Sequence, residues 1–150
     1  LDAGNRWGRT NDVTYIGYGK SSLDKVIEGA AAMQGRVVKG DQNPDRGSFY
    51  RSDQFNFAKI GVPALYIDGG EEFTGADADR HKAKAMAYVD TDYHQTSDNW
   101  GPDWNYDGMI EDTLLAYYSA LSIATEPIAP TWNKGDEFEA TRLKALEAVK

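Results

Sequence analysis

The chain has 150 residues, 41% of them hydrophobic, which is enough apolar surface to order one compact domain. Twenty-four acidic against 16 basic side chains give a net charge of −8, which repels nucleic-acid phosphates and anionic membrane surfaces. No stretch reaches the roughly 20 apolar residues of a membrane-spanning helix. Without cysteine, disulfides and thiolate metal sites are excluded, so a zinc site would need His, Asp and Glu.

Strand and helix patterns alternate along the first part of the chain. Residues 12–19 alternate and are rich in β-branched and aromatic side chains, which predicts a strand closed by glycines. A helix capped by Ser21 or Ser22 follows and ends before Gly35, and residues 36–39 form a second short strand. One face of this helix is apolar: Leu23, Val26, Ile27, Ala30 and Ala31.

Turn residues fill 40–47 and lead into residues 49–53, where we expect a functional loop. Residues 54–59 predict a short helix. The apolar run 64–67 is typical of a buried strand in a parallel sheet.

Helices dominate the remainder. We expect a short one around 80–87, a long amphipathic one over 106–125 and a last one over 136–150. The apolar face of the long helix includes Met109, Leu114, Tyr117 and Leu121. Alternating strands and helices predict an α/β fold, here a three-layer α/β/α sandwich with a mostly parallel central sheet.

The two histidines of the chain have different settings. His94 follows an irregular loop, the kind of position at which an α/β sheet places its chemistry. His81 has carboxylates nearby at Asp77 and Asp79 that could in principle share a metal, but the start of a helix at the protein surface is the favoured interpretation.

Three segments together resemble a known family. The first holds Asp2, then Gly8-Arg9-Thr10-Asn11-Asp12-Val13 and Gly17-Tyr18-Gly19; the second runs from Tyr50-Arg51-Ser52-Asp53 to Gly61-Val62-Pro63-Ala64; the third is Tyr93-His94-x-x-x-Asp98. In this order and spacing they resemble the M28 family of zinc aminopeptidases, over essentially the whole chain.

The resemblance implies two zinc ions bridged by an aspartate and a water or hydroxide. Asp2 matches the carboxylate ligand of one zinc, and His94 matches the histidine ligand of the other. Tyr93 matches the tyrosine whose hydroxyl stabilises the tetrahedral oxyanion in family members. Imidazole and carboxylate are the ligands that a site without cysteine requires.

Four further residues receive roles from their positions in the motifs. Asp98 is expected to orient His94 without binding the metal itself. Arg51, Ser52 and Asp53 are expected to line the substrate pocket or brace the site, with capping of the 54–59 helix by Ser52 or Asp53 as the alternative.

The chain departs from the family by lacking the His-x-Asp and adjacent-glutamate motifs, which precede the position of Asp2 in family members. Its one adjacent pair, Glu71-Glu72, comes after Asp2, so we interpret it as a solvated loop. A catalytic zinc usually has about three protein ligands, and this chain offers one to each metal. We therefore expect residues 1–150 to be the C-terminal portion of a peptidase domain, binding zinc weakly and inactive alone.

Other site patterns fail at defined positions. Residues 103–108 copy half of a calcium loop, but the twelfth position is Leu114 instead of an acidic residue, so Asn105 or Asp107 is better interpreted as a helix cap. Gly19-Lys20-Ser21 ends like a phosphate-binding loop, yet Thr14 stands where glycine is required, and no Gly-x-Ser-x-Gly turn is present.

The leading hypothesis is an aminopeptidase acting on peptides. The alternative is a non-catalytic module of the same fold that binds a peptide or protein. We also expect this chain to self-associate through apolar surface that the missing part of the domain would otherwise cover. Export to the periplasm or out of the cell is suggested by the family resemblance.

Overall fold

Three short strands of the described residues form a single sheet, in the order Val37–Gly40 (β2), Asp12–Ile16 (β1) and Tyr66–Asp68 (β3). A computed structural model describes residues 4–127 and 129–148. Strand β1 (Asp12–Ile16) pairs in parallel with β2 (Val37–Gly40) and antiparallel with β3 (Tyr66–Asp68). The chain is therefore α/β as predicted, but the described sheet is mixed: the apolar strand expected at 64–67 is present over Tyr66–Asp68 and runs antiparallel to β1.

Strand β1 is buried along its whole length because it has a core on each side. Successive side chains of a strand point to opposite faces. Val13 and Tyr15 pack into one cluster of buried apolar residues, whereas Ile16 packs with Phe49 and Ala58 in another. The second half of the predicted strand, residues 17–19, forms a turn.

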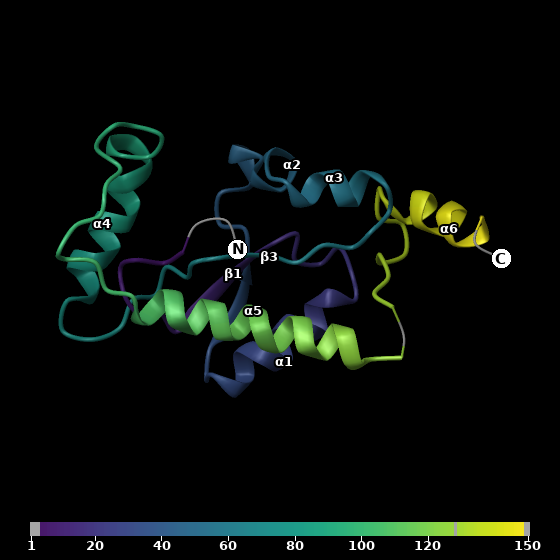
Figure 1. Ribbon diagram of the computed structural model, residues 1–150, viewed down its shortest axis with the longest axis horizontal. Coiled ribbons are helices and arrows are strands. Elements are labelled where there is room, and N and C mark those ends of the chain that lie inside the picture. The colour runs from purple at the N-terminus through teal and green to yellow at the C-terminus, as the bar shows by residue number, and fades with distance from the viewer. Residues whose placement is uncertain (1–3, 128, 149–150) are drawn as a thin grey trace.

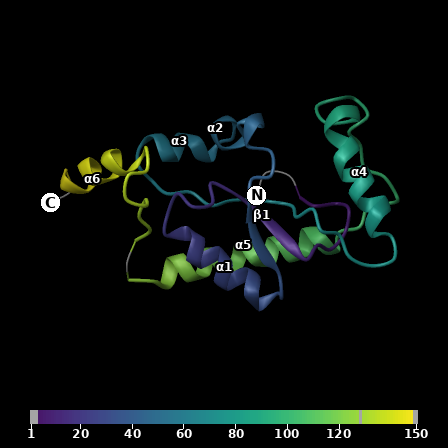
Figure 2. The same cartoon turned by 180° about the vertical axis from the view of Figure 1, so that it is seen from behind.

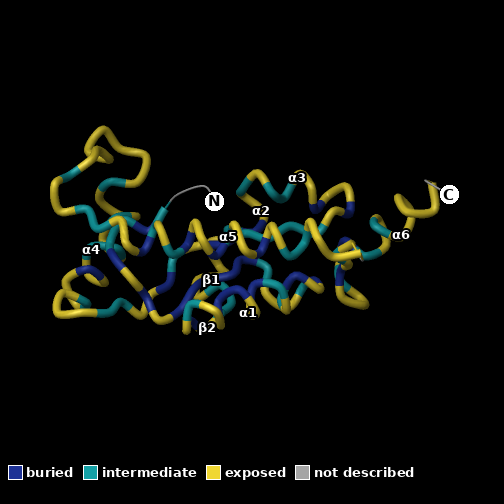
Figure 3. The backbone as a smooth tube through the Cα atoms, turned by 60° about the horizontal axis from the view of Figure 1, so that its bottom comes forward, coloured by how far each residue is buried: buried dark blue, intermediate teal, exposed yellow. Residues whose placement is uncertain are grey.

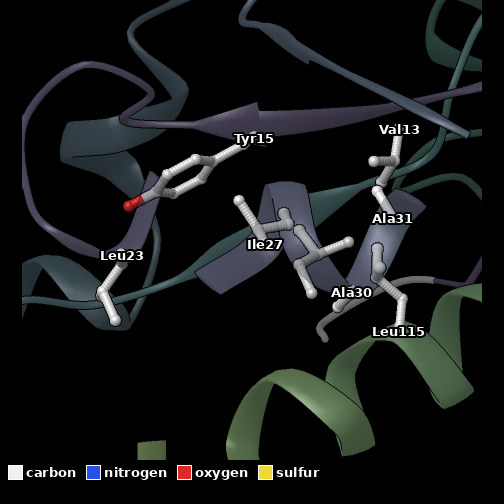
Figure 4. Close-up of a cluster of buried hydrophobic side chains, with 8 residues drawn as sticks. Val13, Tyr15, Leu23, Ile27, Ala30, Ala31 and Leu115 are labelled. Carbon is white, nitrogen blue, oxygen red and sulfur yellow. The ribbon is translucent and has the colours of Figure 1, made fainter. Parts of the chain in front are cut away.

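Helix α1 (Leu23–Met33) covers one side of the sheet and confirms the predicted apolar face. Leu23, Ile27, Ala30 and Ala31 are buried beside Val13 and Tyr15, with Leu115 on the neighbouring helix (Figure 4). Ser22 makes no side-chain cap bond, but the Ser21 hydroxyl accepts a hydrogen bond from the Leu23 amide at 3.3 Å. Gly35 ends the helix with a φ of +70°.

The opposite side of the sheet carries short helices, with η1 (Pro44–Arg46) and α2 (Ser48–Arg51) where a loop was expected. Helix α3 (Gln54–Lys59) agrees with the prediction. Figures 1 and 2 show α2 and α3 across the sheet from α1. Their aromatic core also holds Trp132, whose indole N–H donates to the Gly61 carbonyl at 2.9 Å, and Phe138, just before α6 (Glu139–Glu147).

The long helix α5 (Asp107–Thr125) is present, but the predicted inward face is wrong. It buries Gly108, Asp112, Leu115 and Ser119, while Leu114, Tyr117 and Leu121 are 44%, 58% and 46% exposed. Figure 3 shows much of α5 in the colours of exposed and intermediate residues. Asp112 turns inward because it pairs with buried Arg36. No helix among residues 4–127 and 129–148 is long and apolar enough to cross a membrane.

Helix α4 (Ala78–Thr91) is longer than predicted and stands apart from the sheet in Figures 1 and 2. His81 lies in its first turn, as expected, but is only 9% exposed, so the surface position was wrong. Its ring packs edge-on against Phe73 at 6.3 Å, which explains the burial.

Candidate metal and substrate site

The turn after α4 carries the third motif and places its two aromatic side chains at the surface. The amides of Asp92 and Tyr93 both bond to the Tyr88 carbonyl at 2.9 Å, which closes the helix. His94 then adopts a left-handed backbone with a φ of 59°, a conformation uncommon outside glycine. Its imidazole stacks on the Tyr93 ring with centroids 3.8 Å apart and planes 21° apart. The imidazole and the phenol ring therefore lie face to face.

Both side chains are accessible to a ligand. Tyr93 is 43% exposed, and His94 is also exposed. In the described part of the chain the imidazole has no hydrogen-bond partner, so either of its nitrogens could be the unprotonated one that binds a metal. The donor chemistry at His94 therefore fits a zinc ion.

Asp98 closes the same turn and is held by two donors. Arg6 Nη1 donates to Asp98 Oδ1 at 3.0 Å, and the Tyr88 hydroxyl donates to Oδ2 at 2.6 Å. The Tyr88 hydrogen bond, followed by Arg6, lowers the pKa of Asp98, and the charge of His94 adds a smaller effect. Orientation of His94 by Asp98 stays a prediction, since the carboxylate is directed toward Arg6 and Tyr88.

The second motif lies elsewhere on the molecule, at the junction of α2 and α3. Arg51 Nη1 donates to the Arg46 carbonyl at 3.3 Å, and the Ser52 hydroxyl donates to the Ser48 carbonyl at 3.2 Å. Asp53 is the N-cap residue of α3 but makes no side-chain cap bond, so the capping alternative is not observed. Figures 1 to 3 show α2 well separated from α4, so the structure does not bring these residues beside Tyr93 and His94. Their substrate-pocket role stays a prediction.

The remaining predicted ligand, Asp2, lies outside the described residues. Within residues 4–127 and 129–148, no cluster of three or more His, Asp or Glu side chains could hold a metal ion. The ligand role of His94 therefore stays a prediction, since no such group surrounds it in the described residues.

The competing site patterns are engaged in ordinary structural contacts. Asp103, the first position of the calcium-like loop, pairs with Lys84. The N-cap residue of α5 is Tyr106, not Asn105 or Asp107 as predicted, although Asn105 Oδ1 accepts a hydrogen bond from the Asp107 amide at 3.0 Å beside this helix start. Both glutamates of the adjacent pair are exposed, with Glu72 paired to Lys39, as expected of a solvated loop.

Sequence reasoning missed the groups that support the turn. Arg6 lies against the rings of Tyr88 and Trp104, and all three come from different segments. No spacing rule connects residues so far apart in sequence. The one available signal was the number of aromatic residues near the third motif, which an arginine can stack against.

Comparison with known proteins identifies the family. The model for peptidase family M28 matches residues 1–118 of the 150-residue chain, a span that contains all three motifs. The chain therefore belongs to peptidase family M28, and membership indicates a metallopeptidase that binds peptide substrates. No curated protein and no solved structure matches the chain.

Proposed function

We propose that the chain forms part of a zinc-dependent aminopeptidase domain with a two-zinc site, in which Asp2 and His94 each supply one ligand to a different zinc. The family match carries this proposal, supported by the exposed imidazole of His94 stacked on Tyr93. When bound, the paired zinc ions would polarise the scissile carbonyl and activate a water.

The side chains of this turn have distinct tasks in the proposal. His94 offers a neutral imidazole nitrogen to the metal, and Tyr93 offers a hydroxyl donor to the developing oxyanion. The two rings stack with centroids 3.8 Å apart, so the side chain that carries the hydroxyl lies beside the proposed ligand. Binding of the metal at His94 would thereby also place the oxyanion donor.

We further propose that residues 1–150 are the C-terminal portion of this domain, whose complete form is the three-layer sandwich with a mostly parallel sheet. The outer side of α5 supports this, since five large apolar side chains are exposed along it: Ile110, Leu114, Tyr117, Tyr118 and Leu121. We call this set the α5 stripe. A contiguous apolar helix face of this kind is usually covered in a folded protein.

The α5 stripe predicts self-association of the 150-residue chain. Leu114→Glu with Tyr117→Glu should shift the chain toward monomer, because two charges would interrupt the apolar contact. Sedimentation velocity over a range of concentrations would measure the shift. Ala32→Glu, which adds a charge at an exposed position of α1, is the control and should leave the association unchanged. A wild-type chain that stays monomeric at all concentrations would contradict the prediction.

Hydrolysis of short peptides tests the proposed function. The full-length gene product should release the first residue from a peptide with a free N-terminus and leave the N-acetylated peptide intact, because an aminopeptidase recognises the terminal amine. The 150-residue chain with added zinc should show no release. Peptide binding by the full-length product without hydrolysis would favour the non-catalytic alternative.

The family resemblance also suggests export to the periplasm or out of the cell. Detection of the protein in periplasmic or culture fractions would test this export.

A further inference from the structure

The side chain of Arg6 lies where three separate segments meet. Its guanidinium carbon is 4.1 Å from the ring centre of Tyr88 on α4 and 4.7 Å from that of Trp104 in the loop before α5. The side chain is only 12% exposed, although a lone arginine in a loop is usually well solvated. Stacking between two aromatic rings is a geometry for which the planar guanidinium is suited.

Hydrogen bonds fix the same residue in two directions. Through its side chain, Arg6 donates to Asp98 Oδ1 at 3.0 Å, while the Tyr88 hydroxyl holds Oδ2 at 2.6 Å. Through its backbone, the Arg6 carbonyl accepts from the Asn105 amide at 2.8 Å. The Tyr93–Asp98 turn is thereby tied to the N-terminal segment by one charge-assisted hydrogen bond, between an Arg6 side chain that is 12% exposed and an Asp98 side chain that is 29% exposed.

This tie joins the segments that carry the two proposed zinc ligands. Arg6 follows Asp2 by four residues, and Asp98 follows His94 by four residues. We propose that Arg6 is a positioning residue that acts through Asp98 to hold the segment after Asp2 and the Tyr93–His94 turn at a set spacing. The inference rests on the proposed function for its zinc ligands, but the tie itself is a property of the described residues.

Hydrogen exchange of the metal-free 150-residue chain tests the tie. The amides of Gln95 and Asp98 bond within the turn, to the carbonyls of Asp92 and Gln95. Arg6→Ala should make both amides exchange about 10-fold faster or more, while amides of β1 keep their protection. Arg9→Ala is the matched control, since Arg9 is a nearby exposed arginine paired with Glu111, and it should change neither amide. Unchanged exchange in Arg6→Ala would overturn the inference.

Zinc affinity of the full-length gene product, measured by competition with a chelator, tests the positioning role. Arg6→Ala and Asp98→Asn should each weaken zinc binding about 10–100-fold, the range seen when residues that orient a metal ligand are changed. If Arg6 acts through Asp98, the double variant should lose no more zinc affinity than whichever single variant binds zinc more weakly. Additive losses, or wild-type affinity in Arg6→Ala, would overturn the role.

A His94→Ala variant separates this inference from the proposed function. Loss of zinc in His94→Ala with full affinity in Arg6→Ala would overturn the positioning role and leave the ligand assignment standing. Full zinc binding in His94→Ala would overturn the ligand assignment and, with it, the positioning of a zinc ligand by Arg6.

Discussion

Replacement of Arg36 by alanine is expected to lower the free energy of unfolding by about 3–5 kcal/mol, because it leaves a buried carboxylate unpaired. Arg36 Nη1 donates to Asp112 Oδ1 at 2.7 Å, and both side chains are 3% exposed. Arg36 Nη2 also donates to the Thr10 hydroxyl at 2.9 Å and the Asp12 carbonyl at 2.7 Å. One side chain therefore joins α5 to the start of β1, and urea unfolding would measure its loss.

The neighbouring ion pair Arg9–Glu111 gives a matched control. It also links the N-terminal segment to α5, with a distance of 2.9 Å, but the Arg9 side chain is 58% exposed. Arg9→Ala should cost at most about 1 kcal/mol, as exposed pairs do. Equal losses in the free energy of unfolding for Arg9→Ala and Arg36→Ala would contradict the greater importance of the buried pair. A double variant, Arg36→Met with Asp112→Leu, should recover much of the stability because no buried charge is left.

The cost of Arg36→Ala should also depend on pH. Burial raises the pKa of Asp112, and Arg36 opposes that rise. Without Arg36 the folded-state pKa of Asp112 rises further above its unfolded value of about 3.9, so the folded state binds the proton more tightly. The variant should therefore be least destabilised at low pH and lose stability as the pH rises through the raised pKa. A cost that grows toward acid pH would contradict this.

Gly108→Ala is expected to lower the free energy of unfolding by at least about 1–3 kcal/mol, because the backbone of the N-terminal segment passes directly over this glycine. A Cβ atom at Gly108 would lie 2.1 Å from the Gly8 carbonyl oxygen and 2.5 Å from Asn5 Nδ2. Gly29 on α1 is the control, since a Cβ there meets no atom within 4 Å. Gly29→Ala should stabilise the chain by up to about 1 kcal/mol through helix propensity. Thermal unfolding would compare the two, and a tolerated Gly108→Ala would contradict the packing.

The orientation of an element could be predicted from the sequence only where local interactions determine it. Helix α1 was predictable because its apolar period coincides with the face it buries. The inward face of α5 was not, since an ion pair with Arg36 and the close approach at Gly108 turn the helix, and neither has a local pattern. The direction of β3 was also missed, because an apolar run carries no sign of parallel or antiparallel pairing.

The candidate site shows the same limit. Tyr93, His94 and Asp98 stand out because their motif is local, and the family match covers them. Their support comes from Arg6 and Tyr88, at long separations in sequence, which only the folded chain brings together. The burial of His81 against Phe73 escaped prediction for the same reason.

Zinc content of the full-length gene product tests the ligand assignment most directly, with elemental analysis of the wild type, His94→Ala and His81→Gln. His81 is the only other histidine among the 150 residues and is buried in α4, so its variant serves as the control. We expect two zinc ions per chain in the wild type and in His81→Gln, and a clear loss of zinc in His94→Ala. Wild-type zinc content in folded His94→Ala would contradict it.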